Sequence, residues 1–496
     1  MNTKMIRYIL CRMLGVESVL LMIPVIVAAL YQEMSGIAFL IPAGILLLLF
    51  FLAGVKKPEQ SHIYGKEGMV IVALAWILWS LFGAMPFTIS GFIPNYMDAF
   101  FETVSGFTTT GSSILRDVEA LPQCLLFWRS LTHWIGGMGV LVFVLVLTSL
   151  DKKNSMYLMR AEVPGPEKDK LVPKAMSTAR ILYGMYLIMT VVEIIFLMLG
   201  GVNLFDSMIF SFGSAGTGGF SNYADSVAHF HSAYIDGVIT TFCALFGVNF
   251  SLFYFMLLGD FKSVRKNEEL RTYIMLIVGA TALITLNIHS MFPSMIKAFR
   301  YAIFQVVTVI TTTGYATTDF NTWPEISRTI LLLLMFIGAC AGSTGGGIKV
   351  SRFIIGIKTI FREIQSYIHP KSVKVIKTEG KPVDSETCRS VSIYFITFIM
   401  IFTASLLLIS IEGKDIVTNF TAVAATINNI GPGLSAVGPT QNFGSYSDFS
   451  KYVLMFDMLA GRLELFPLII LFTPSIWKDL VTKKVSERKM RRIRRG

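Results

Sequence analysis

Long apolar runs recur from one end of the chain to the other, separated by short polar and glycine-rich segments. Two such runs come first, at about 5–30 and 36–55. Four similar units follow, and each consists of a long apolar run, a shorter apolar segment and a second long run. Because about 20 apolar residues of helix cross a bilayer, this pattern predicts an all-α integral membrane protein with ten transmembrane helices.

The shorter segments cannot cross a membrane by themselves. Each holds about 13 residues, which makes roughly 20 Å of helix, whereas the hydrocarbon core is about 30 Å thick. The turn that ends each segment must therefore lie within the membrane, where irregular backbone persists only if protein buries it or it lines a wet cavity. We expect four re-entrant pore-helix hairpins, arranged with fourfold pseudo-symmetry around one ion pathway.

These runs set the expected boundaries. They lie at 68–90, 97–109 and 128–150; 180–200, 204–216 and 237–259; 272–290, 298–312 and 327–350; and 391–411, 416–429 and 452–475. The chain then divides into two leading helices in 1–60, pore repeat 1 in 61–160, pore repeat 2 in 161–265, pore repeat 3 in 266–385, and pore repeat 4 with a basic tail in 386–496.

Each short segment runs into a turn rich in threonine or glycine. The turns read TTTG at 108–111, GTGG at 216–219, TTTG at 311–314 and NNIG at 428–431, and their last glycines are 108, 95 and 117 residues apart. Glycine lets backbone carbonyls approach an ion without an intervening side chain, and carbonyls can replace a cation's hydration shell. Ordinary Gly/Thr connections are the alternative, but four equivalents at a near-constant period favour a filter. The candidate filter residues are Thr109, Thr110, Gly111, Thr217, Gly218, Gly219, Thr312, Thr313, Gly314, Asn429, Ile430 and Gly431.

Composition and charge agree with a membrane protein. The 496 residues are 53% hydrophobic and 15% charged, against about 25% charged in soluble proteins. On the expected topology, 35 of the 43 Lys and Arg residues fall on one side and 7 on the other, so the positive-inside rule places both termini in the cytoplasm. The basic tail at 488–495 then favours a contact with anionic membrane lipid over nucleic-acid binding. Five scattered cysteines indicate neither a disulfide framework nor a zinc site.

The second long run of repeat 3 carries five glycines within 338–347, which would weaken a helix. A phosphate-binding Walker loop is excluded because Ile348 stands where that motif needs lysine. Close helix packing through small residues remains an alternative. We favour a broken, movable gate beside the filter, formed by Gly342, Ser343, Thr344, Gly345, Gly346 and Gly347.

Arg462 is expected in the middle of the last transmembrane run. A charge at that depth is costly and faces either a partner or a pathway. An internal ion pair with Glu464 or Asp457 is one interpretation, and an electrostatic barrier that belongs to the gate is the other.

Four segments carry a resemblance to a known family: SGFTTTGSS, SAGTGGFSN, VITTTGYATTDF and NNIGPGLSAVGP. They resemble the filter segments of the Trk/Ktr/HKT potassium-transporter superfamily, and the two leading helices and the length are most similar to the bacterial TrkH branch. The resemblance implies four non-identical repeats around one pathway, with K⁺ held at the filter residues and no organic cofactor. It also implies a homodimer in the bacterial inner membrane and regulation by a cytosolic TrkA-like ring that binds nucleotides. In this family the corresponding loop and arginine act in gating, which supports the functional interpretation of both.

The sequence therefore predicts potassium uptake through a channel-like pore with a backbone-carbonyl selectivity filter. A secondary transporter that couples potassium to sodium or proton symport is the alternative. Such transporters often contain inverted repeats, whereas all four repeats here are expected to begin on the cytoplasmic side. An enzyme is not expected, because the chain has no HExxH or GxSxG motif. The fourth turn lacks threonine, which predicts weaker selectivity than four identical turns would give.

Overall fold

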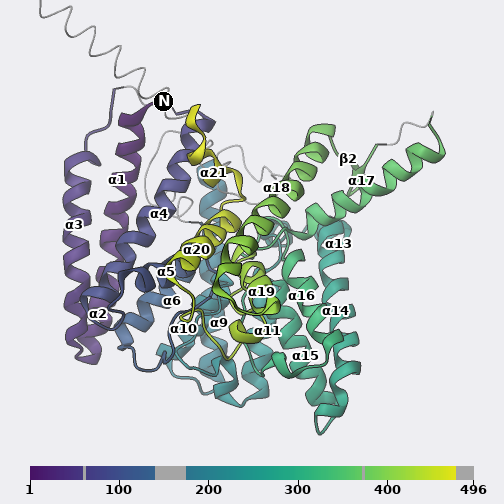
Figure 1. The fold of residues 1–496 in the computed structure, drawn as a ribbon, viewed down its shortest axis with the longest axis horizontal. Coiled ribbons are helices and arrows are strands. Elements are labelled where there is room, and N and C mark those ends of the chain that lie inside the picture. The colour runs from purple at the N-terminus through teal and green to yellow at the C-terminus, as the bar shows by residue number, and fades with distance from the viewer. Residues whose placement is uncertain (60–62, 140–174, 371–374, 476–496) are drawn as a thin grey trace, which may run out of the picture.

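A computed structural model of the chain describes residues 1–59, 63–139, 175–370 and 375–475. Almost every regular element among them is a helix (Figure 1). The exception is a hairpin of two short strands, β1 (Lys377–Thr378) and β2 (Lys381–Pro382), in which Lys377 pairs with Pro382 and Thr378 with Lys381. The expected all-α class therefore holds for the described residues apart from this hairpin.

The leading helices form one edge of the molecule (Figure 1). They are α1 (Thr3–Leu20) and α2 (Met22–Tyr31), followed by a short 3₁₀ turn (Met34–Gly36) and α3 (Ile37–Ala53). Helices α1 and α3 pack along each other, and Leu46 and Phe39 of α3 are fully buried while Leu48 and Phe51 are exposed. Helix α3 thus has one face in the protein and one apolar face turned outward.

Four groups of helices follow in chain order. The first holds α4 (Gly65–Ile89), α5 (Tyr96–Phe107) and α6 (Gln123–Gly137); the second holds α9 (Ala175–Leu199), α10 (Leu204–Gly216), α11 (Ala233–Phe246) and α12 (Phe250–Leu257). After α13 (Phe261–Lys266), the third holds α14 (Glu268–Ile288), α15 (Met295–Ile310), α16 (Glu325–Ile337) and α17 (Val350–Ile368). The fourth holds α18 (Ser385–Ile409), α19 (Ile416–Ile427), α20 (Asp448–Arg462) and α21 (Phe466–Ile469).

The four short helices α5, α10, α15 and α19 begin in the same way. Each has an N-cap side chain that accepts a hydrogen bond from a backbone N–H in the first turn, which replaces a bond the helix itself cannot supply. These N-caps are Asn95, Asn203, Ser294 and Asp415. The acids near two of the starts are also engaged, since Asp98 pairs with Lys451 and Asp206 accepts from Asn222 Nδ2 at 2.6 Å.

The second long helix of each group is not the continuous span that the apolar runs suggested. Residues expected at 237–259 form α11 and α12, which are bent by 92°. The break has a local cause, because Gly247 ends α11 and the side chain of Asn249 caps α12 by accepting from Ser251 N at 2.9 Å. The run at 452–475 likewise stops at Arg462, and α6 stops at Gly137.

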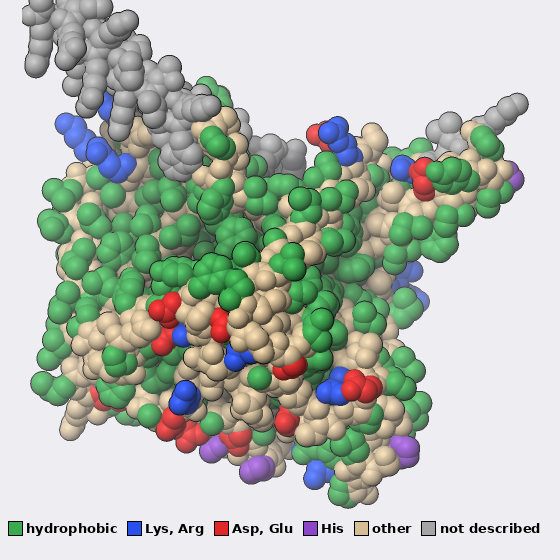
Figure 2. All heavy atoms as spheres, viewed as in Figure 1, with side chains coloured by type: hydrophobic (Ala, Val, Ile, Leu, Met, Phe, Trp, Pro, Cys, Tyr) green, Lys and Arg blue, Asp and Glu red, His purple; other side chains and the backbone are tan. Residues whose placement is uncertain are grey.

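By length and composition, six described helices can cross a membrane, or seven if α11 and α12 count as one span. The remaining expected spans are shorter or broken helices. The part of the first repeat at 140–150, most of the basic segment at 151–180 and the tail at 488–495 lie outside the described residues. On the face drawn in Figure 2, hydrophobic side chains cover most of the upper and middle part, and charged side chains lie along the upper edge and across the lower half. Val278, Leu283, Ile396 and Met400 are between 59% and 68% exposed. The chain is a multi-pass membrane protein.

Candidate functional site

The four short helices end in one shared backbone conformation. The residue two before each final glycine has a positive φ: 53° at Thr109, 54° at Thr217, 61° at Thr312 and 56° at Asn429. The next residue donates its N–H to the carbonyl five positions earlier, as in a Schellman cap. These bonds join Thr110 to Ser105, Gly218 to Gly213, Thr313 to Thr308 and Ile430 to Ala425, at 2.9, 2.8, 2.8 and 2.9 Å. Left-handed backbone at non-glycine residues costs about 1–3 kcal/mol each, and such strain gathers at functional sites.

The final glycines bring the four turns together in a closed ring. Their φ values are also positive, at 81°, 76°, 77° and 99° in chain order. A Cβ atom on each would collide with a carbonyl oxygen of the next turn. The distances are 2.0 Å from Gly111 to Gly218 O, 2.0 Å from Gly219 to Thr313 O, 2.0 Å from Gly314 to Ile430 O, and 2.9 Å from Gly431 to Thr110 O. All twelve candidate filter residues therefore belong to one cluster, in which each turn contacts the next.

The geometry also separates the two adjacent glycines of the second turn. Gly219 has the positive φ shared by the other final glycines. Gly218 occupies the position of Thr110, Thr313 and Ile430, and a Cβ there would lie 2.2 Å from His133 Nδ1. Gly219, the last glycine of the second turn, therefore has the backbone conformation of the final glycines in the other three turns.

Side-chain contacts around the ring differ between the turns. The first and third turns are alike, with Oγ1 atoms 2.8 Å apart in Thr108 and Thr110 and 2.9 Å apart in Thr311 and Thr313. In the fourth turn, Asn429 Nδ2 donates to Thr110 Oγ1 and to the carbonyl of Met458, both at 2.9 Å. The asparagine of the fourth turn therefore bonds the threonine of the first.

A glycine-rich loop lies directly against the ring. Helix α16 ends at Ile337, and residues 338–349 are not helical before α17 begins at Val350. The N–H of Gly346 donates to Thr312 Oγ1 at 2.6 Å, and the N–H of Gly347 donates to the carbonyl of Asn428 at 3.0 Å. A Cβ on Gly346 would lie 2.3 Å from the Asn428 carbonyl. The predicted break in this run is present, and the candidate gate residues contact two of the four turns.

Arg462 also donates a hydrogen bond to this loop. It is the last residue of α20 rather than a mid-helix residue, because the helix stops there. Its Nη1 donates to the carbonyl of Thr344 at 2.7 Å, and its Nη2 donates to the carbonyls of Gly136 and Gly137 at 2.6 and 2.7 Å. The two acids considered as its partners are bonded elsewhere: Glu464 pairs with Arg352, and Asp457 accepts from Ser405 at 2.6 Å.

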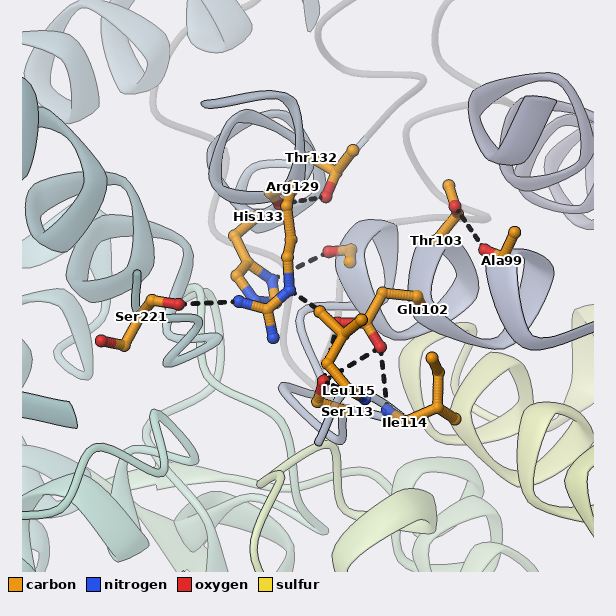
Figure 3. A network of polar contacts seen from close by, with 11 residues as sticks. Ala99, Glu102, Thr103, Ser113, Ile114, Leu115, Arg129, Thr132, His133 and Ser221 are labelled. Atoms are coloured by element: carbon orange, nitrogen blue, oxygen red, sulfur yellow. Dashed lines mark hydrogen bonds and ion pairs between the residues drawn. The ribbon is translucent and has the colours of Figure 1, made fainter. Parts of the chain in front are cut away.

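Two further groups were missed by sequence reasoning. Glu269, in the first turn of α14, has one oxygen that accepts from the N–H groups of Ala341 and Ser351, at 2.7 and 3.0 Å. It thereby joins the glycine-rich loop to the start of α17. Glu102 and Arg129 form a buried ion pair behind the first turn (Figure 3). The signal in the sequence was a charged residue in a helix of a membrane protein, where a charge needs a partner, but the sequence does not identify which residue that partner is.

These features define a class: a multi-pass helical membrane protein whose four short helices end in loops that close around one centre. A family model described as "TrkH: Cation transport protein" matches residues 38–479. The chain belongs to the TrkH family of cation transport proteins, which are transporters rather than enzymes. The family predicted from the four turn segments is thus confirmed.

Relatives match over nearly the whole chain. "Trk system potassium uptake protein TrkH" of Escherichia coli K12 is 36% identical over 466 residues, which is 92% of this chain and 96% of that protein. TrkG of the same organism is 32% identical over 491 residues, covering 97% and 100%. The crystal structure of the potassium transporter TrkH from Vibrio parahaemolyticus superposes with a TM-score of 0.87 at 32% identity, covering 96% of this chain and 100% of that one.

Proposed function

We propose that this protein takes up potassium by passive conduction through the ring of four turns. The observation that carries the proposal is the closed sequence of glycine-to-carbonyl contacts, in which every turn lies against the next. The relatives named as potassium uptake proteins support the choice of ion. On this proposal the fold has ten membrane-crossing segments and four re-entrant hairpins, with fourfold pseudo-symmetry about the pathway.

The ring can stabilise a cation although it contributes no negatively charged side chain. Backbone carbonyls of 109–111, 217–219, 312–314 and 429–431 replace the hydration shell of K⁺. The C-terminal ends of four helices meet at these residues, and each carries a partial negative charge of the helix dipole. The strained left-handed residues hold the carbonyl directions fixed, so the ring does not have to reorganise when an ion enters.

In this proposal, residues 342–347 of the glycine-rich loop form the gate together with Arg462. The loop contacts the ring through Gly346 and Gly347, and Arg462 holds it through Thr344. The gate opens when the loop leaves these partners. The bonds to Thr312, Asn428 and Arg462 therefore set the equilibrium between the closed and the open position of the loop. The guanidinium also repels cations near the pathway, which slows conduction.

The remaining proposals follow from family membership. The protein forms a homodimer in the bacterial inner membrane, with both termini in the cytoplasm and membrane lipid around it. A cytosolic TrkA-like ring that binds nucleotides controls the gate. The transported ion is K⁺, and no organic cofactor is used on this chain.

The test is cation flux in proteoliposomes that contain the purified chain, with and without its cytosolic partner. Rubidium, potassium and sodium are compared in wild type and in Gly111→Ser. The serine Cβ would collide with the Gly218 carbonyl, so we expect the preference for rubidium over sodium to fall by about tenfold or more. Gly91→Ser is the matched control, because Gly91 has the same φ of 81° with nothing within 4 Å of the added Cβ.

Passive rubidium flux in wild type, with selectivity lost only in Gly111→Ser, supports the proposal. Flux that requires a sodium or proton gradient would replace it with symport. Equal effects of the two serine substitutions would mean that backbone strain, rather than the ring contact, explains the loss.

A further inference from the structure

A buried ion pair lies behind the first two turns of the ring (Figure 3). Glu102 comes from the short helix α5 and Arg129 from α6, and Arg129 Nε lies 2.6 Å from Glu102 Oε1. The side chains are 1% and 5% exposed. Taking two charges out of water is unfavourable unless their remaining hydrogen-bonding atoms are also satisfied. The other contacts of the two side chains therefore identify the chain segments that the pair holds in place.

Glu102 holds the first turn where the chain leaves the ring. Its two oxygens accept from the Ser113 hydroxyl at 2.9 and 3.1 Å, and Oε2 also accepts from the N–H of Ile114 at 3.0 Å. Ser113 and Ile114 follow directly after Gly111 and Ser112. The carboxylate thus fastens the outgoing segment of the first turn to the helix that enters it.

Arg129 holds the second turn at the equivalent place. Its Nη1 donates to the carbonyl of Ser221 at 2.9 Å, and its guanidinium lies over the ring of Phe220, 3.4 Å from the centroid. Phe220 and Ser221 follow directly after Gly219. A planar guanidinium can make both contacts at once, with hydrogen bonds at its edge and an aromatic ring on its face.

Among the described residues, the other three boundaries in the ring are joined by neutral groups. Between the third and fourth turns, Asn321 Nδ2 donates to the carbonyl of Ser435 at 3.1 Å. Between the second and third turns, the Tyr315 hydroxyl donates to the carbonyl of Phe210 at 2.9 Å. Between the fourth and first, the Ser112 hydroxyl donates to the carbonyl of Gly431 at 3.0 Å. The residues that correspond to Glu102, nine positions before each final glycine, are Phe210, Gln305 and Ala422. Among these four positions only the first carries a charge.

We propose that Glu102 and Arg129 are positioning residues that fix the first two turns relative to each other and thereby set the preference for potassium over sodium. This inference rests on the proposed function of the ring. The side-chain bonds given for the pair go to residues just after the final glycines of the first two turns and not to the candidate filter residues themselves, so the pair fixes both segments that leave the Gly111–Gly218 contact. Selectivity depends on where carbonyl oxygens lie, so a small shift of one turn against the next changes it.

The test compares Glu102→Gln, Arg129→Gln, the double variant and Arg129→Lys in proteoliposomes. The matched control is Thr103→Val, which removes a buried hydroxyl from the same helix whose bond goes to the Ala99 carbonyl at 2.8 Å, away from the turns. The first readout is the ratio of rubidium to sodium flux. The second is the rise in thermal midpoint produced by K⁺ over that produced by Na⁺, which reports ion binding without requiring an open gate.

We expect Glu102→Gln to lower the flux ratio about fivefold and to reduce the K⁺-specific thermal shift, because a charged acceptor is lost and Arg129 is left uncompensated. The double variant should lower the ratio no further than either single variant, since the two residues act as a unit. Arg129→Lys keeps the charge but loses the planar fork, so its ratio should fall between wild type and Arg129→Gln.

Each other result would overturn the inference in a recognisable way. Wild-type flux with an unchanged ratio in Glu102→Gln would reject the positioning role and leave the proposed function intact. An equal loss in Thr103→Val would assign the effect to general packing. If Glu102→Gln does not assemble, a wild-type ratio in the double variant would reject the role. Wild type with neither potassium flux nor a K⁺-specific shift, with the partner present, would reject both proposals.

Discussion

In each of the four turns, the residue two positions before the final glycine has a left-handed backbone, and it is threonine in three turns and asparagine in one. Glycine would adopt this backbone without strain, so the side chains must have a use that outweighs the cost. In two turns that use is visible. Thr312 Oγ1 accepts from the N–H of Gly346 in the glycine-rich loop, and Asn429 bonds Thr110. Thr109 Oγ1, by contrast, is buried with no hydrogen-bond partner among the described residues.

This difference provides a matched pair of variants. Thr312→Val keeps the shape and the backbone but leaves the buried N–H of Gly346 without its acceptor, which costs about 1 kcal/mol or more and so about fivefold in the equilibrium between loop positions. We expect faster rubidium flux, because the loop leaves the ring more readily. Thr109→Val makes the same chemical change where no protein partner is lost. Equal fluxes in the two variants would show that the bond to Gly346 does not hold the loop.

At the scale of whole elements, the periodic pattern predicted the short helices and their turns well. The expected segments at 97–109, 204–216, 298–312 and 416–429 correspond to α5, α10, α15 and α19, because half-length apolar runs that end in threonine or glycine are a local signal. The break in the third repeat was also local, since its glycines lie next to one another.

The remaining breaks and the partners of the charges could not be predicted in the same way. Hydropathy continues unchanged through the bend between α11 and α12, where the signals are a single glycine and the capping Asn249. Arg462 meets carbonyls of residues 118 and more than 300 positions away. Such contacts depend on how the repeats pack against each other, which a single sequence does not record.

Glu269 gives a prediction at this scale. One of its oxygens accepts two backbone N–H groups, from Ala341 in the loop and Ser351 in α17. Glu269→Ala leaves both donors unpaired, at about 1–3 kcal/mol each. We expect faster hydrogen exchange at these two amides and a larger flux in the absence of the cytosolic partner. Glu268→Ala is the control, because the neighbouring Glu268 pairs with Lys358, and both side chains are 30% exposed. Similar exchange in the two variants would contradict a specific hold on the loop.

At the scale of the molecule, the face drawn in Figure 2 carries a broad area of apolar side chains between an upper edge and a lower half that bear charged groups. The proposed orientation places the segment before α14 in the cytoplasm and the segment between α10 and α11 outside. The five cysteines are all buried, so thiol reagents should give little background.

Orientation can therefore be tested by labelling single exposed cysteines in cells with a membrane-impermeant maleimide. His231→Cys should react in intact cells, and Arg265→Cys should react only after the membrane is permeabilised, because both positions are exposed but on opposite sides in the proposed topology. Labelling of Arg265→Cys in intact cells would reverse the assignment. Rubidium uptake by each variant confirms that the labelled protein is assembled.

The closed ring of turns comes from one continuous chain, and this has a consequence for how the protein can change over time. In an assembly of four identical copies, every mutation near the axis is repeated four times, so a mild defect is multiplied. Here a mutation alters one of the four turns around the axis and leaves the other three unchanged. The asparagine in the fourth turn and the charged pair behind the first are two such single-turn departures. A gene that encodes all four turns in one chain can therefore change the residues at the axis one turn at a time, whereas in a symmetric tetramer each mutation changes all four turns.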